Sequence, residues 1–120
     1  MKKILIVEDS AQFRHLLVDL LDGYCDKVYE CTDGMDVMRA YKKYKPDCVV
    51  MDIQMNEMDG FDATRRLKVI HPEARVVLMS QYNDPEIQQE AKMVGAERSV
   101  PKENILELRT IFSKKIKSVA

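Results

Sequence analysis

Three acidic residues directly follow two short apolar runs in this sequence. Glu8 and Asp9 come after the run 4–7, and Asp52 ends the run 48–51. Both runs are rich in β-branched and other apolar side chains, which is typical of strands that are covered on both faces. A carboxylate at the end of a buried strand is therefore a candidate for chemistry.

A hydroxyl and a lysine follow two later strand-like runs. Ser80 comes after the run 75–79, and Lys102 comes shortly after the run 97–100. If these runs pair in a parallel sheet, their carboxyl ends meet at one edge, where ligands bind. Three carboxylates gathered there repel one another by roughly 2–4 kcal/mol per pair at an effective dielectric of about 20. Such a group needs a cation, and oxygen ligands favour Mg²⁺ or Mn²⁺.

A divalent cation, a hydroxyl and a lysine around one carboxylate suit the three oxygens of a phosphoryl group. The metal would hold one oxygen, Lys102 a second, and Ser80 with nearby N–H groups the third. Asp52 is then the expected nucleophile of an in-line phosphoryl transfer, assisted mainly by charge neutralisation. Each residue alone has a plainer explanation as a helix cap or a loop residue. Their joint occurrence at strand ends favours the chemical interpretation.

Five strand-like segments alternate with five helical patterns along the chain. This alternation predicts right-handed crossovers and an open parallel sheet with helices on both faces, in one α/β domain. We expect strands at 3–7, 27–31, 47–51, 75–79 and 97–100, and helices from Ser10 to Gly23, at 35–44, 61–70 and 85–95, and from Asn104 onward.

Local signals mark the ends of these helices. Ser10 is a suitable cap for the first helix, whose apolar positions include Leu16. Asp84 followed by Pro85 predicts the start of the fourth helix. Asn104 stands three residues before a glutamate, so a capping box is expected at the start of the last helix.

Composition excludes several classes of protein. The 120 residues, 46% hydrophobic and 32% charged, are typical of one globular domain. A formal net charge of −1 gives no electrostatic reason to expect nucleic acid or an acidic membrane as a partner. No apolar stretch is long enough for a membrane span or a signal-peptide core. The three cysteines form no C-x-x-C pair, so we expect reduced thiols and a cytoplasmic location.

Four segments together carry a family resemblance: "ILIVEDS", "DCVVMDIQMNEMDG", "VVLMS" and "GAERSVPKE". Over essentially all of residues 1–120 the chain resembles the receiver domain of two-component response regulators, and chemotaxis regulators in particular. The resemblance implies a doubly wound (βα)5 domain with a five-stranded parallel sheet in the order 2-1-3-4-5, a flavodoxin-like three-layer sandwich.

The resemblance also implies a role for each site residue. Asp52 would be the phosphoacceptor, Ser80 the switch hydroxyl and Lys102 the phosphate-binding lysine. The phosphoryl group would come from a sensor histidine kinase or a phosphotransfer protein. The domain would be a regulatory phosphoacceptor rather than an enzyme, although it assists its own phosphotransfer and autodephosphorylation.

The expected cofactor is Mg²⁺, with Mn²⁺ as an alternative. Asp9 and Asp52 would ligate it directly, the backbone carbonyl of Gln54 would complete the protein ligands, and Glu8 would act through water. Phosphorylation would control a downstream protein or an attached output domain, and homodimers would form through the face made by the fourth helix, the last strand and the last helix. A stand-alone receiver and a regulator without its effector domain both remain open.

One position departs from the family. The aromatic residue usual on the last strand is replaced by Ser99, which by itself looks like a surface residue of the strand. The familiar coupling between a switch hydroxyl and this aromatic cannot run through Ser99.

Two rival classes fit less well. An aspartate-based phosphohydrolase would need an acid where Gln54 stands, and a flavin-binding module would need a phosphate loop where Glu8 and Asp9 would repel phosphate. The remaining alternative is a degenerate receiver that acts as a phosphorylation-independent interaction module.

Overall fold

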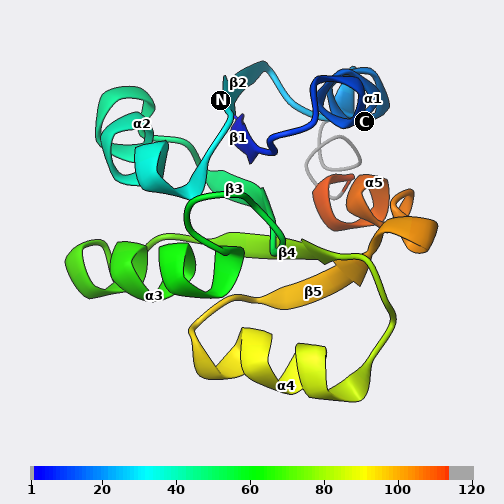
Figure 1. Cartoon of the computed structure of the whole chain (residues 1–120). Coiled ribbons are helices and arrows are strands. Elements are labelled where there is room, and N and C mark those ends of the chain that lie inside the picture. The colour runs from blue at the N-terminus through cyan, green and yellow to red at the C-terminus, as the bar shows by residue number, and fades with distance from the viewer. Residues whose placement is uncertain (1, 114–120) are drawn as a thin grey trace.

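The computed structural model describes residues 2–113, and Figure 1 shows strands and helices alternating along the chain. The end of the expected domain, residues 114–120, lies outside the described residues. The elements are β1 (Lys3–Val7), α1 (Ala11–Leu21), β2 (Lys27–Cys31), the short 3₁₀ turn η1 (Gly34–Asp36), α2 (Val37–Tyr44), β3 (Cys48–Asp52), α3 (Gly60–Ile70), β4 (Val76–Ser80), α4 (Pro85–Met93), β5 (Arg98–Pro101), the 3₁₀ turn η2 (Lys102–Asn104) and α5 (Glu107–Phe112).

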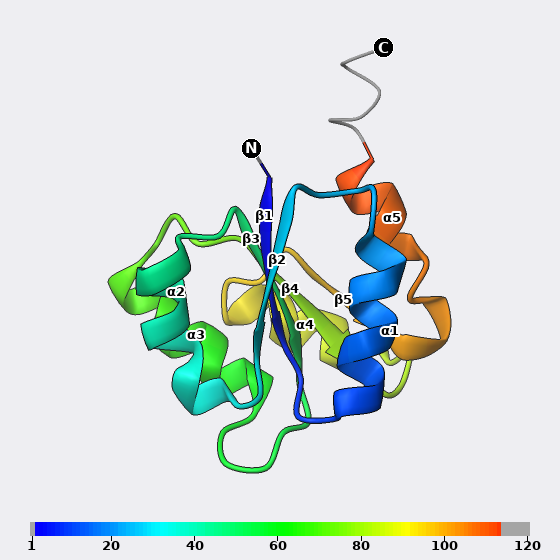
Figure 2. The same cartoon turned by 90° about the horizontal axis from the view of Figure 1, so that it is seen from above.

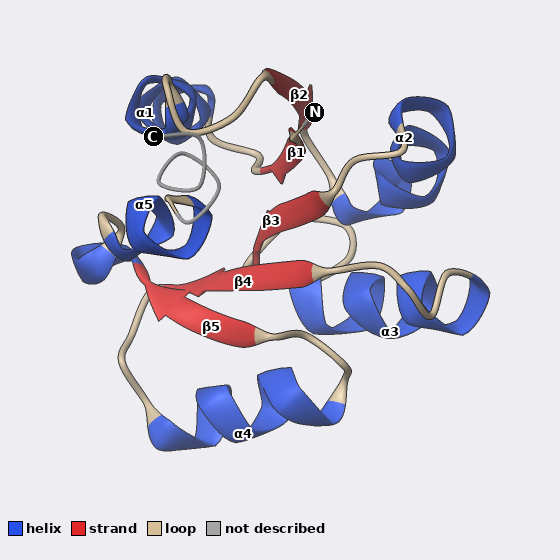
Figure 3. Ribbon diagram, turned by 180° about the vertical axis from the view of Figure 1, so that it is seen from behind, coloured by secondary structure: helices blue, strands red, loops and turns tan. Residues whose placement is uncertain are grey.

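The five strands form one parallel sheet in the order β2-β1-β3-β4-β5 (Figure 3). The expected order is therefore confirmed, and so is the flavodoxin-like architecture. β1 pairs with β2 and β3, and Val7 lies opposite Met51 of β3. The strand register brings the ends of β1 and β3 side by side.

Helices cover both faces of the sheet. Figure 2 shows α1 and α5 on one face and α2 and α3 on the other. α4 covers the same face as α2 and α3, since its Ala91 belongs to the same core as Leu67 of α3. Successive residues of a strand point to opposite faces, so each strand contributes to two cores. Leu5 and Met51 belong to the core under α2 and α3, whereas Ile6 and Val50 belong to the core under α1 and α5. These fully buried strands explain the nearly continuous apolar runs in the sequence.

Two of the expected helix caps are confirmed. Ser10 Oγ accepts a hydrogen bond from the backbone N–H of Phe13, at 3.3 Å. Asp84 Oδ1 accepts one from the backbone N–H of Glu86, at 2.9 Å, and Pro85 is the first residue of α4. Each cap satisfies a backbone donor that has no partner within its helix.

The expected capping box at Asn104 is wrong. Asn104 is the last residue of η2, and α5 begins at Glu107 after Leu106, which makes no side-chain cap. A capping residue needs an extended backbone, and a residue inside a 3₁₀ turn does not have one. The second helix likewise begins at Val37, because the three residues before it form η1, capped by Asp33.

Two residues are buried differently from what the sequence suggests. Leu16 is 48% exposed, because it lies about 100° around the α1 axis from Leu17, where the packed stripe is centred. Ser99 is not a surface residue: it is buried on β5, which α4 partly covers. The helices within residues 2–113 include none with the length and hydrophobicity of a membrane span. The cysteines Cys25, Cys31 and Cys48 are all free thiols.

Candidate functional site

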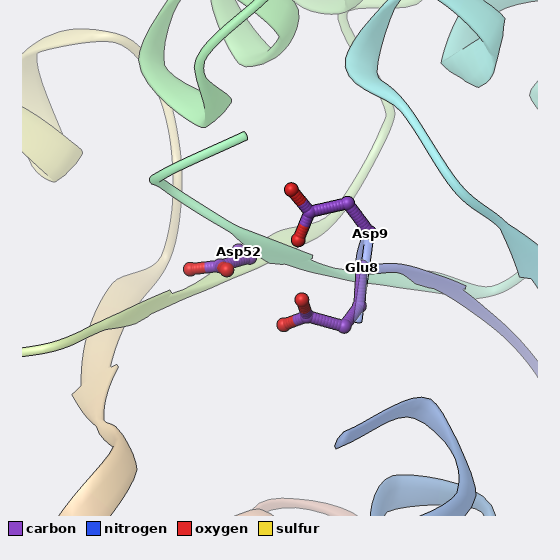
Figure 4. Close-up of side chains that lie close together, drawn as sticks. All are labelled: Glu8, Asp9 and Asp52. Atoms are coloured by element: carbon purple, nitrogen blue, oxygen red, sulfur yellow. The ribbon is translucent and has the colours of Figure 1, made fainter. Parts of the chain in front are cut away.

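The ends of β1 and β3 bring three carboxylates together. Glu8 and Asp9 follow β1, Asp52 is the last residue of β3, and one carboxylate oxygen of each lies within 4.8 Å of the others. Figure 4 shows that the side chains of Glu8 and Asp9 extend toward Asp52. Glu8 and Asp52 are both buried. The sheet therefore assembles a compact group of carboxylate oxygens at its carboxyl edge.

Lys102 balances part of this negative charge. Its Nζ donates hydrogen bonds to Asp52 Oδ2 at 3.1 Å and to Glu8 Oε1 at 3.3 Å. The same ammonium stands 4.3 Å from the centroid of the Phe13 ring. Burial lowers the pKa of Lys102, but the charges and hydrogen bonds of Asp52 and Glu8 outweigh it, so the pKa is raised. The lysine is a fixed cation beside Asp52.

Glu8 is the carboxyl group most affected by its surroundings. Its pKa is raised to about 7, chiefly by burial and also by the Asp9 side chain and the charge of Asp52. A hydrogen bond from the backbone N–H of Ser10, at 2.9 Å, and the charge of Lys102 oppose this shift. Ionising Glu8 beside two other carboxyl groups is unfavourable, and a divalent cation would offset this cost. The donor set therefore fits Mg²⁺, since it consists of hard oxygen ligands.

Ser80 and Gln54 lie on the segments next to Asp52. Ser80 is the buried last residue of β4, and its Oγ donates to the backbone oxygen of Tyr82 at 2.7 Å. The backbone N–H of Gln54 donates to Asp52 Oδ1 at 3.3 Å. Among the described residues, Ser80 makes no hydrogen bond to Asp52. The structure thus joins Glu8 and Lys102 to Asp52 directly and places Ser80 on the adjacent strand.

Two further residues support the site and were missed from the sequence. Arg14 Nη1 donates to the backbone oxygen of Glu8 at 2.8 Å, which holds the turn between β1 and α1. Gly60 packs so closely against the end of β3 that a Cβ there would be 2.6 Å from the backbone oxygen of Asp52. A larger residue would therefore clash with the strand. Glycine is a weak helix former, so its presence as the first residue of a helix is a sequence signal that could have drawn attention to Gly60. Arg14 has no such signal, since an arginine on α1 resembles any surface charge.

A family model described as the response regulator receiver domain matches residues 4–112 of the chain. The chemotaxis protein CheY of Thermotoga maritima is 37% identical over 103 residues, which cover 84% of this chain and 85% of that protein. Sporulation initiation phosphotransferase F of Bacillus subtilis is 33% identical over 95 residues, which cover 79% of this chain and 77% of that protein.

A solved structure shows the same fold. The receiver domain of Ssk1 from Saccharomyces cerevisiae, crystallised with the histidine phosphotransfer protein Ypd1, superposes with a TM-score of 0.86 at 17% identity, covering 93% of this chain and 86% of that chain. The likeness to Ssk1 shows a shared fold, whereas the matches to the family model and to the curated relatives are similarities of sequence. On these matches, together with the sheet order and the acidic edge described above, the chain belongs to the response regulator receiver domain family.

Proposed function

We propose that the domain accepts a phosphoryl group on Asp52 and that this modification controls a downstream protein or an attached output domain. Receiver domains are regulatory proteins of two-component systems rather than classical enzymes. The observation that supports Asp52 most strongly is the bond from Lys102 Nζ to Asp52 Oδ2, at 3.1 Å, beside two further carboxylates. A buried carboxylate with a fixed cation next to it can bring a phosphoryl group and its charge to one place.

The proposed reaction is an in-line transfer from a phosphohistidine. A carboxylate oxygen of Asp52 forms a bond to phosphorus while the bond from phosphorus to the imidazole nitrogen breaks. The imidazole leaves with the electron pair and takes up a proton, and Asp52 becomes an acyl phosphate. Lys102 then pairs with a phosphoryl oxygen in place of the carboxylate oxygen that it contacts in the free protein.

Receiver domains bind Mg²⁺ at an acidic site, and we propose that Asp9, Asp52 and the backbone carbonyl of Gln54 ligate it here, with Glu8 acting through water. When bound, the ion neutralises charge on the phosphoryl oxygens. The hydroxyl of Ser80 would leave the Tyr82 carbonyl and bond to the phosphoryl group, which links the site to the β4–α4 loop.

We further propose that the receiver domain comprises residues 1–120, acts in the cytoplasm and assists its own dephosphorylation. Receiver domains interact with histidine kinases or phosphotransfer proteins, so the donor is of that class. The face formed by α4, β5 and α5 is the proposed surface for output or homodimerisation. We expect no nucleic acid and no membrane as a partner of this domain.

The test is the intact mass of the protein after incubation with acetyl phosphate and Mg²⁺. We expect the wild type to gain one phosphoryl group and Asp52→Asn to gain none. Lys102→Met is the second variant, since its loss of charge should slow the gain without removing the acceptor. Omitting the metal should also prevent the gain.

The alternative is a degenerate receiver that acts without phosphate. It would be favoured if neither acetyl phosphate nor a phosphohistidine donor modified the wild type while the protein bound Mg²⁺ and remained folded. Modification at a residue other than Asp52 would contradict the proposed function directly.

A further inference from the structure

A groove lies between α2 and the C-terminal end of α3, away from the carboxylate site. Figures 1 and 2 show these two helices side by side on the same face of the sheet. The groove has a volume of about 710 Å³ and is lined by Met38, Arg39, Lys42, Lys43, Ile70 and His71.

Apolar side chains form part of this groove and of its surroundings. Met38 is half-buried and packs against the core, whereas Ile70 is 63% exposed and its neighbour Val69 is 77% exposed. Single exposed hydrophobic residues are ordinary. Val69 and Ile70, however, are adjacent exposed hydrophobic residues at the end of a helix and lie beside an apolar groove. Protein interaction sites commonly have such an apolar centre surrounded by a polar rim.

The rim of the groove is positively charged. Three of its residues are Arg39, Lys42 and Lys43, and no acidic residue of the described part of the chain lines it. Arg39 is paired with Asp36 at 2.6 Å, but within residues 2–113 neither lysine forms an ion pair. The whole chain carries a formal net charge of −1, so this local excess of cations is not a property of the general surface. Its charge complements an acidic partner.

We propose that this groove binds an acidic amphipathic helix of a protein partner. Apolar side chains at helical positions i, i+3 or i+4, and i+7 would enter beside Met38 and Ile70. Carboxylates flanking this stripe would pair with Lys42 and Lys43. The groove is concave and has three basic residues at its rim. Segments that bind acidic membranes present an apolar face with larger clusters, of about four to eight Lys or Arg residues. These observations favour a protein helix over a lipid surface.

The location of the groove separates it from phosphorylation. α2 and α3 each lead into the strand that follows, so their C-terminal ends lie near the amino ends of β3 and β4. Asp52 lies at the opposite, carboxyl end of β3. A helix bound in the groove therefore leaves Asp52 accessible to a phosphodonor, and the two events can occur on one molecule.

The test uses a synthetic acidic peptide of helical design, with leucines at i, i+3, i+4 and i+7 and glutamates at the flanking positions. A second peptide has lysines in place of the glutamates. Fluorescence anisotropy measures binding to the whole chain, and amide chemical shifts locate the bound peptide. We expect the acidic peptide to bind with a Kd below about 1 mM and to shift amides of α2 and of the end of α3.

Two charge-reversed variants make the test specific. Lys42→Glu/Lys43→Glu should weaken binding of the acidic peptide at least about tenfold. Arg66→Glu/Lys92→Glu makes the same change of net charge at exposed helix positions outside the groove, and should change the Kd by less than about twofold. Ile70→Ser should also weaken binding, and thermal unfolding checks that each variant is folded.

Several results would overturn the proposal. The acidic peptide could bind no more tightly than the lysine peptide, or fail to bind up to about 1 mM. The two double variants could also lose affinity for the acidic peptide equally. Cosedimentation with phosphatidylglycerol vesicles that requires Lys42 and Lys43, without specific binding of the acidic peptide, would assign the groove to a membrane. A dimer in sedimentation experiments that Ile70→Ser dissociates would assign it to a second copy of the chain.

Discussion

The side-chain amide of Gln88 on α4 bonds to both backbone polar groups of Ser99 on β5. Its Oε1 accepts from the Ser99 N–H at 3.0 Å, and its Nε2 donates to the Ser99 carbonyl. Within residues 2–113, β5 is an edge strand that pairs only with β4, so Gln88 takes the place of a further strand at this point. The contact fastens α4 to the strand on which the family usually carries an aromatic residue.

Replacing Gln88 with alanine should loosen this attachment. The variant loses two hydrogen bonds, and the backbone N–H and carbonyl of Ser99 must then bond to water instead. We therefore expect the free energy of unfolding to fall by about 1–2 kcal/mol. Urea unfolding measures the loss, and faster hydrogen exchange at the Ser99 amide locates it. Gln89→Ala is the control, because Gln89 is an exposed neighbour on the same helix. Equal stability of the two variants would show that the Gln88 contact contributes nothing in solution.

Replacing Ser99 with alanine should stabilise the domain. Ser99 is buried, and its Oγ has no hydrogen-bond partner among the described residues. Burying a hydroxyl without a partner is unfavourable, so its removal should raise the free energy of unfolding by about 1 kcal/mol. Ser113→Ala serves as a comparison, since that hydroxyl donates to the Thr110 carbonyl at an exposed position. A lower thermal midpoint for Ser99→Ala would contradict this prediction.

Replacing Asp9 with asparagine should have opposite effects with and without Mg²⁺. Removing one of three neighbouring carboxylates relieves repulsion, so the metal-free protein should gain about 1 kcal/mol of stability. The stabilisation that Mg²⁺ gives by binding the folded state should shrink or vanish. Thermal unfolding in EDTA and in excess Mg²⁺ measures both, with Asp19→Asn as an exposed control on α1. An undiminished response to Mg²⁺ would exclude Asp9 as a ligand.

Replacing Phe13 should test whether its ring positions Lys102. The ring centroid lies 4.3 Å from Lys102 Nζ, a distance at which a cation–π contact is favourable. Phe13→Leu should slow phosphorylation by acetyl phosphate about two- to fivefold, and Phe13→Tyr, which keeps a ring, should retain the wild-type rate. Equal rates in the leucine and tyrosine variants would mean that the ring only fills space.

The ion pair of Arg75 with Glu97 should make stability depend on pH. The hydrogen bond from Arg75 is the main reason why the pKa of Glu97 lies below its ordinary value of 4.5. A lowered pKa in the folded state stabilises the fold above pH 4.5, and this stabilisation is lost as the pH falls through the folded-state pKa. The difference in stability between wild type and Glu97→Gln should therefore be full at neutral pH and shrink in acid. A difference that stayed constant down to acidic pH would contradict the assignment to Glu97.

The strands and the acidic edge could be predicted because both follow from short-range patterns. Buried parallel strands must be apolar at every position, and Asp52 interrupts such a pattern at the end of β3. The family resemblance then gave the sheet order. Ser10 and Asp84 were recognisable as caps because the cap bond reaches only two or three residues along the chain.

The features that were missed depend on contacts between distant segments. Ser99 looks like a surface residue until α4 is placed beside it. The contact of Phe13 with Lys102 joins α1 to the turn after β5, and no local pattern encodes it. Asn104 satisfied a local rule, but the chain forms a 3₁₀ turn there, so the capping rule did not apply.

The bond between Lys102 and Glu8 spans 94 residues of sequence. During synthesis Glu8 leaves the ribosome directly after β1, whereas Lys102 leaves only after β5. A growing chain that stops before β5 holds Asp52 without its neighbouring ammonium. Under the proposed function, the ammonium beside Asp52 arrives only when the last strand docks, so a chain truncated before β5 should be a poor phosphoacceptor.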